Sequence, residues 1–145
     1  MHLHCPFCIT RVKITDHTNS HVIKQLIHCL ITKIQTSHKK NSDHLYVFKS
    51  RSHSNDEFES WVGNNYNDYE LIQKGSSIKF CEIAEGNADL YPRFGSTSEW
   101  DIAAGHIILV ESGGEIKSID DKKIIYNDKE SVINPPFIAS CKLDK

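Results

Sequence analysis

The stretch that decides the fold is residues 99–114, which read EWDIAAGHIILVESGG. Its apolar run predicts a helix over residues 100–112, and we expect that helix to stop at the glycine pair 113–114. Residues 95–98, Gly-Ser-Thr-Ser, precede it and are typical of a loop. A long helix entered from a small, polar loop is therefore the first element of the predicted fold.

One acidic side chain, Asp101, lies in the first turn of this predicted helix. A carboxylate there usually just stabilises the helix, because it faces the positive end of the helix dipole. Ala103, Ala104 and Gly105 follow, and such small residues let another element pack closely. A carboxylate that points from such a turn into a cleft is a natural oxygen ligand for Mg²⁺. Local physics favours capping for Asp101 and leaves the metal role open.

Short apolar segments on both sides of this helix alternate between strand and helix patterns. We expect strands at residues 45–48, 69–73 and 88–91, around Ile116, and at residues 124–126 and 137–138. We expect further helices around Phe58, Trp61 and Val62 and over residues 78–84, the second closed by Gly86. The polar residues 35–44 indicate a loop. Mixed strands and helices in this order predict an α/β layered domain.

The sequence Gly75-Ser76-Ser77 stands at a predicted strand-to-helix junction. Unpaired backbone N–H groups and the helix dipole favour an anion at such a place, and small residues let a phosphate or sugar approach. Gly-Ser turns also cap many helices that bind nothing. The residues alone therefore leave ligand contact and simple capping both open.

The composition excludes several classes of protein. The chain has 145 residues, 39% of them apolar and 25% charged, and it is too rich in aromatic residues for a disordered segment. No apolar run approaches the roughly 18 residues of a membrane-spanning helix, and no secretory signal is visible at the first residues. Five cysteines do not form a dense disulfide framework. We expect a globular protein of the cytoplasm, without an integral membrane segment.

Charge changes sign along the chain near Lys49. Lys and Arg exceed Asp and Glu by five before residue 50, and fall seven short from there on, which gives the net charge of -2. Seven of the nine histidines also precede residue 50. We expect a basic, histidine-rich segment over residues 1–49, without an assigned role, and the α/β domain over residues 50–145.

The first segment offers two features of its own. Apolar residues recur at helical spacing over residues 20–34 and predict an amphipathic helix. Cys5 and Cys8, with His2 and His4 nearby, could form a zinc or redox site, but no second Cys/His pair follows and no strand can precede Cys5. Aromatic residues are sparse here and the lysines form no stripe, so we expect no polymeric nucleic acid as a partner.

Several stretches together resemble the C-terminal half of CysQ-type 3'(2'),5'-bisphosphate nucleotidases, which belong to the inositol monophosphatase superfamily. These are SRSH at residues 50–53, GSSIKFCEIAEGNADLYPRFG at residues 75–95, EWDIAAGHIILVESGG at residues 99–114, and NPPF at residues 134–137. The WDIAAG element is typical of the whole superfamily, whereas GSSIKFC with LYPRFG favours the nucleotidase branch. The resemblance covers residues 50–145, and we expect residues 1–49 to lie outside the family.

The resemblance implies both a fold and a reaction. The fold is a layered αβαβα sandwich, of which this chain would be the second αβ half. The reaction is the Mg²⁺-dependent, Li⁺-sensitive removal of a phosphate from 3'-phosphoadenosine 5'-phosphate, which yields AMP. Some relatives are peripheral to a membrane, so association with the inner membrane stays open.

The resemblance also implies roles for six residues. Asp101 stands at the position of a metal-ligand aspartate near the substrate phosphate. Ser76 and Ser77 begin the helix that contacts the nucleotide. Lys79 and Arg93 approach the phosphate that is retained, and His53 borders the nucleotide pocket.

The chain lacks other parts of that family's machinery. The family supplies most metal ligands from its first half, through a glutamate and an Asp-Pro-x-Asp-Gly-Thr motif, and no such motif occurs here. Two-metal phosphate hydrolysis needs several carboxylates, so we expect weak Mg²⁺ binding and little turnover by the chain alone. The alternatives are a nucleotide-binding module or a subunit completed by a separately encoded N-terminal half, an inositol monophosphatase-like hydrolase, and a zinc or redox module at Cys5 and Cys8.

Overall fold

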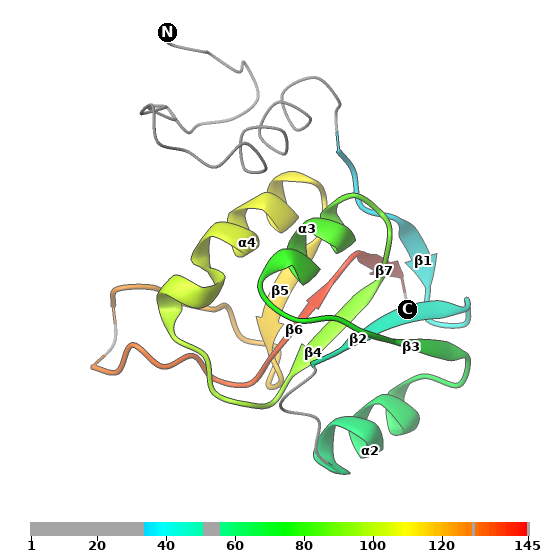
Figure 1. Cartoon of the computed structure of the whole chain (residues 1–145), viewed down its shortest axis with the longest axis horizontal. Coiled ribbons are helices and arrows are strands. Elements are labelled where there is room, and N and C mark those ends of the chain that lie inside the picture. The colour runs from blue at the N-terminus through cyan, green and yellow to red at the C-terminus, as the bar shows by residue number, and fades with distance from the viewer. Residues whose placement is uncertain (1–33, 51–55, 129, 145) are drawn as a thin grey trace, which may run out of the picture. The chain divides into compact units, whose positions relative to one another are not determined.

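A computed structural model describes residues 34–50, 56–128 and 130–144 (Figure 1). All of these residues except Ile34 belong to a compact unit that begins at Gln35. The expected helix at residues 20–34, except for Ile34, lies outside the described residues, as do Cys5, Cys8 and His53.

The main sheet of this unit has the strand order β3-β2-β4-β6-β5. Its strands are β2 (Leu45–Lys49), β3 (Tyr69–Gln73), β4 (Leu90–Arg93), β5 (Glu115–Ser118) and β6 (Phe137–Ser140). β2 runs parallel to β3 and to β4, whereas β6 runs antiparallel to β4 and to β5. A small second sheet pairs β1 (His38–Lys40) with β7 (Lys142–Asp144) in parallel. The parallel half of the main sheet is the part that carries the site below.

Helices cover both faces of the main sheet (Figure 1). They are α2 (Asp56–Asn65), α3 (Ile78–Ala84) and α4 (Glu99–Glu111). Successive strand residues point to opposite faces, so Leu45 and Val47 of β2 pack in the cluster around α2. Phe48 packs instead with the residues of α3 and α4. The sheet is therefore buried from two sides, as expected of an α/β layered unit.

Contact between α3 and α4 depends on one glycine. Gly105 is buried on α4, and a Cβ atom added there would lie 2.5 Å from Cδ2 of Phe80 on α3. The sequence predicted close packing at Ala103, Ala104 and Gly105. The structure confirms close packing at Gly105 but not at the two alanines, because both alanines are exposed.

Most of the expected elements are present. The helix expected at residues 100–112 is α4, and the helix at 78–84 and the strand at 69–73 have the predicted bounds. The strand expected at 88–91 begins two residues later, as β4. No strand forms at residues 124–126 of the described chain, because Ile124 packs into the core from an irregular segment with one isolated bridge, Lys117 to Lys123.

The change of charge near Lys49 does not coincide with a boundary in the fold. β2 lies before residue 50 and pairs with two strands of the main sheet. β1 lies within the expected loop at 35–44, where it pairs with the last strand of the described chain. The compact unit therefore starts about fifteen residues before the expected position, since charge composition reports on the surface and not on strand pairing.

None of the described helices has the length and apolar character that a membrane span requires.

Candidate functional site

A cleft of about 630 Å³ lies at the carboxyl ends of the parallel strands. Ser50 follows β2, Gly75 and the two serines after it follow β3, and Arg93 ends β4, and all of them line the cleft. β3 and β4 lie on opposite sides of β2, so the chain changes direction across the sheet at this place. Ligands of open α/β sheets bind at such switch points, outside the carboxyl ends of the strands.

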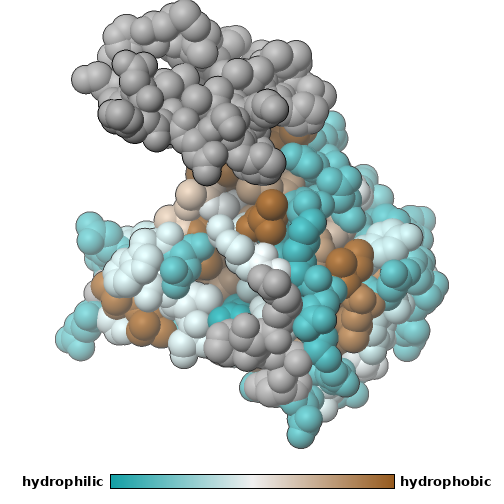
Figure 2. Space-filling model, in the orientation of Figure 1, coloured by the Kyte–Doolittle hydropathy of each residue, from teal (hydrophilic) through white to brown (hydrophobic). Residues whose placement is uncertain are grey.

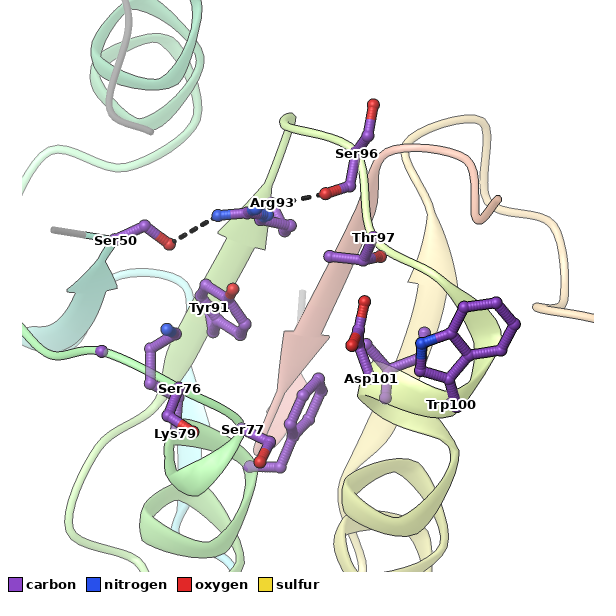
Figure 3. Close-up of a pocket in the computed structure, with 13 residues that line it drawn as sticks. Ser50, Ser76, Ser77, Lys79, Tyr91, Arg93, Ser96, Thr97, Trp100 and Asp101 are labelled. Atoms are coloured by element: carbon purple, nitrogen blue, oxygen red, sulfur yellow. Dashed lines mark hydrogen bonds between the residues drawn. The ribbon is translucent and has the colours of Figure 1, made fainter. Parts of the chain in front are cut away.

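The start of α4 forms the facing wall of the cleft. Thr97, Trp100 and Asp101 line it there. Figure 3 shows the Asp101 carboxylate directed into the cleft and the Trp100 ring at its outer edge, while Ser77 and Lys79 approach from α3. The fold therefore brings Ser76, Ser77, Lys79, Arg93 and Asp101 together in one cleft, whereas His53 lies outside the described residues. The roles that the family resemblance implies for them stay predictions.

Arg93 is the best-anchored charge in the cleft. Its side chain is buried and donates from Nε to Gly95 O at 3.0 Å, from one terminal nitrogen to Ser50 Oγ at 3.0 Å, and from the other to Ser96 O at 3.3 Å. A guanidinium has five N–H donors, so further donors remain for a ligand. No described carboxylate forms an ion pair with it. A buried cation of this kind favours an anion nearby.

Lys79 supplies a second buried positive charge. The residue is 3% exposed, and its ammonium lies 4.4 Å from the centre of the Tyr91 ring. It also donates to the carbonyl of Lys74 at 3.2 Å. The aromatic face and the carbonyl stabilise the ammonium and hold it in the wall of the cleft. Lys79 is thus a positioned group and not a mobile surface lysine.

The two serines between β3 and α3 adopt an uncommon turn. Ser76 has a φ of 65°, a conformation that costs a residue other than glycine about 1–3 kcal/mol and is frequent at functional sites. Ser77 follows as the N-cap of α3, but its side chain makes no capping hydrogen bond. Both side chains are exposed at the cleft. Their hydroxyls therefore stand where a polar ligand could reach them.

Asp101 caps its own helix. Its Oδ2 accepts a hydrogen bond from the backbone N–H of Ser98 at 2.7 Å, as part of a capping box. This confirms the capping interpretation that local physics favoured. Oδ1 accepts no hydrogen bond from any residue that the structure describes, and the side chain is exposed to the cleft. Asp101 can therefore cap the helix with one oxygen while it offers the other.

Metal binding needs more than this carboxylate. Across the described residues, no three His, Cys, Asp or Glu side chains lie close enough together to hold an ion. Mg²⁺ prefers six oxygens in near-octahedral order, most of them from carboxylates, substrate and water. The described residues thus do not form a magnesium site by themselves, although Asp101 has the right chemistry for one ligand.

Some residues of the cleft were not predicted from the sequence. Tyr91 precedes Arg93 by two positions on β4, and residues two apart on a strand share a face. That period could have placed Tyr91 in the cleft once Arg93 was chosen. Ser50 lies in the SRSH stretch, and Ser96 and Thr97 lie in the predicted loop at residues 95–98, but none of the three was assigned to the site, because loop residues are positioned only by what packs against them.

Comparison with known proteins gives the family context. A model of the Inositol monophosphatase family matches residues 3–142. This match begins far before residue 50, so the expectation that residues 1–49 lie outside the family is wrong. It includes the whole of the cleft described above.

Individual relatives point the same way. The 3'(2'),5'-bisphosphate nucleotidase CysQ of Salmonella typhimurium is 46% identical over 91 residues, which cover 63% of this chain and 37% of the relative. CysQ of Escherichia coli is 41% identical over 94 residues, which cover 65% of this chain and 38% of the relative. Both similarities confirm the resemblance that the sequence motifs suggested.

Solved structures show the same fold. CysQ from Bacteroides thetaiotaomicron, a bacterial member of the inositol monophosphatase family, is 36% identical, with a TM-score of 0.67 over 94% of this chain and 50% of that one. An inositol monophosphatase from Anabaena is 20% identical, with a TM-score of 0.55 over 75% and 44% of the two chains. The expected fold class is confirmed. The chain spans half, or less, of the length of these relatives.

Proposed function

The chain belongs to the inositol monophosphatase family, and we propose that its cleft is the nucleotide-binding part of a 3'(2'),5'-bisphosphate nucleotidase. The proposed substrate is 3'-phosphoadenosine 5'-phosphate, a small nucleotide with two phosphates. The observation that carries this proposal is the pair of buried cations, Lys79 and Arg93, at the carboxyl ends of the parallel strands.

Each residue of the cleft has a part in the proposal. Arg93 and Lys79 bind the phosphate that is retained, because both are held in place and both are basic. Ser76 and Ser77 donate hydroxyl hydrogen bonds to the nucleotide. His53, which follows Ser50 by three positions, borders the same pocket in the proposal and lies outside the described residues.

Asp101 is the proposed link to the reaction. It serves as one oxygen ligand of Mg²⁺, an ion that neutralises charge on a phosphoryl group in this kind of hydrolysis. The remaining ligands must come from residues other than those described, because the described part offers no further cluster. We therefore propose that the chain by itself turns over little or no substrate.

Two further readings remain as alternatives. The chain could act as a nucleotide-binding module or as a subunit that a separately encoded N-terminal half completes. It could also hydrolyse inositol monophosphates, since the family model matches that broader class. We propose the cytoplasm as the compartment, as the sequence suggested, because five cysteines do not form a dense disulfide framework.

Binding of the substrate tests the cleft directly. Calorimetry should detect adenosine 3',5'-bisphosphate binding to the full chain, and weaker binding of inositol 1-phosphate. Arg93→Gln should lower nucleotide affinity about 10- to 150-fold, because a hydrogen bond to a charged group contributes about 1.5–3 kcal/mol. Lys122→Gln, an exposed lysine in the β5–β6 connection, is the control. Equal affinity for both ligands would refute the nucleotidase assignment. An Arg93→Gln variant with unchanged nucleotide affinity would refute the cleft as the binding site.

Phosphate release tests the completeness of the enzyme. The chain is assayed with Mg²⁺ and 3'-phosphoadenosine 5'-phosphate, alone and mixed with the N-terminal half of a CysQ relative. Activity in the mixture only would support a subunit of a split enzyme. Turnover by the chain alone, at the rate of a complete relative, would contradict the proposal that ligands are missing.

A further inference from the structure

Asn134 is a buried polar residue that the proposed function does not use. It is 5% exposed and lies at the end of the β5–β6 connection, just before β6. Its backbone N–H donates to the carbonyl of Thr97 at 2.8 Å, and its side-chain Nδ2 donates to Thr97 Oγ1 at 3.2 Å. Two hydrogen bonds thus join Asn134 to a residue that lines the cleft.

The buried position of the Asn134 side-chain amide costs folding free energy. Its Oδ1 is buried and accepts no hydrogen bond from the described residues. A threonine hydroxyl can donate as well as accept, so the opposite orientation of the amide would keep the Thr97 contact and leave Nδ2 without a partner instead. An apolar side chain of similar size would avoid this penalty. The amide therefore contributes chiefly through its bond to Thr97.

The bond to Thr97 holds the turn from which α4 begins. Ser98, the next residue, is the N-cap of α4, and its N–H is the donor to the Asp101 carboxylate. The residues just before Asn134 contact the same turn. The carbonyl of Val132 accepts a hydrogen bond from the N–H of Glu99 at 2.9 Å, and Ile133 forms an antiparallel bridge with Ser98. Residues 132–134 and 97–99 thus run side by side, and we call this pair of segments the clamp.

We propose that Asn134 is a positioning residue for the cleft: through Thr97 it fixes the turn at Ser98, and thereby the place where Asp101 presents its carboxylate. An exposed aspartate can rotate about two side-chain bonds, and the N–H of Ser98 is the group that holds this one. The orientation of the Asp101 carboxylate therefore depends on how well the backbone of Ser98 is held in position. The inference rests on the proposed function for the role of Asp101, but not for the geometry of the clamp.

Hydrogen exchange, followed by NMR on the full chain, measures the clamp without any ligand. Asn134→Ala should speed exchange of the Ser98 amide about five- to tenfold, and leave the Gly114 amide, bonded to Leu109 O past the other end of α4, unchanged. Thr97→Val removes the same contact from the cleft side, so it replaces Asn134→Ala if that variant fails to fold. The double variant should exchange no faster than either single one, because both act on one bond. Asn65→Ala, which removes an exposed amide bond on α2, is the control.

A second measurement connects the clamp to Asp101. Mn²⁺ alone, added as a paramagnetic probe, should broaden the amide signals of the first turn of α4, and Asn134→Ala should raise the Mn²⁺ concentration needed at least threefold. Uniformly faster exchange, or faster exchange with unchanged Mn²⁺ broadening, would overturn the positioning role. If Mn²⁺ fails to broaden these signals in the unaltered chain, the metal role of Asp101 fails, and the exchange rates alone decide whether the clamp exists.

Discussion

Replacing Gly105 with alanine tests how α3 and α4 are held together. An added Cβ would meet Phe80 at three atoms, Cδ2 at 2.5 Å, Cγ at 2.7 Å and Cβ at 2.9 Å. Carbon atoms pack at about 3.5–4.0 Å. Phe80 is 1% exposed and contacts the rings of Tyr91 and Phe137. Turning its ring would not relieve the contact at its own Cβ, so one of the helices must shift.

Two opposing effects set the size of the change. Alanine is about 1 kcal/mol better than glycine inside a helix. Forcing an extra methyl into a packed core costs about 1–3 kcal/mol, and the short contact with the Cβ of Phe80 places this case in the upper part of that range. Gly105→Ala should therefore lower the free energy of unfolding by about 1–2 kcal/mol. With a urea m-value of about 2 kcal/mol/M, the midpoint should fall by about 0.5–1 M.

Gly63→Ala is the matched control, since it is the same substitution in α2. A Cβ there would meet only the Tyr69 hydroxyl, at an ordinary 3.8 Å. This variant keeps the gain in helix propensity without the clash, so it should stabilise the protein by up to about 1 kcal/mol. Urea unfolding followed by circular dichroism measures both variants. If Gly105→Ala stabilises the chain as much as Gly63→Ala does, the close contact between α3 and α4 is not real.

Three further predictions concern other parts of the unit. Burial lowers the pKa of His106, so the folded chain favours its neutral ring. The contribution of His106 to the free energy of unfolding is therefore complete above its ordinary pKa of 6.5 and is lost as the pH falls below that value. His106→Gln should flatten this part of the dependence of the free energy of unfolding on pH, which urea titrations at several pH values would reveal. Burial raises the pKa of Cys141 to about 11, so iodoacetamide at pH 8 should label Cys141 much more slowly in the folded chain than in the urea-unfolded chain. Equal labelling of the two states by mass spectrometry would contradict the buried position. Apolar side chains remain exposed on α4, with Ile107 54% and Val110 43% exposed, and Figure 2 shows hydrophobic areas at the surface. Ile107→Lys should therefore reduce self-association in sedimentation velocity, whereas an unaltered chain that is already monomeric would argue against association through this face of α4.

Local patterns in the sequence predicted most of the elements. α3 and β3 have the expected bounds, and α4 differs by one residue at each end. These elements are set by neighbours in the chain, through apolar spacing and terminal glycines. The strand expected at residues 124–126 failed because Ile124 is apolar for a different reason, namely that it fills the core from an irregular segment.

The candidate site was predicted from the family resemblance and not from local patterns. Five of the six residues implied by the family motifs, Ser76, Ser77, Lys79, Arg93 and Asp101, line one cleft, and His53 lies outside the described residues. The roles assigned to them stay predictions. The motifs could not show that Asp101 also caps α4, nor that Ser50 and Thr97 belong to the same cleft.

The sequence by itself determined most of the kinds of element, the family, and the residue types that line the cleft. Only the tertiary structure decided which distant segments meet. β1 pairs with β7 across more than a hundred residues, Arg93 donates a hydrogen bond to Ser50, and Gly105 packs closely against Phe80. Such contacts depend on strand order and on how two helices pack, and no local pattern encodes either, because each is settled by the burial of surfaces that the chain brings together only when it folds.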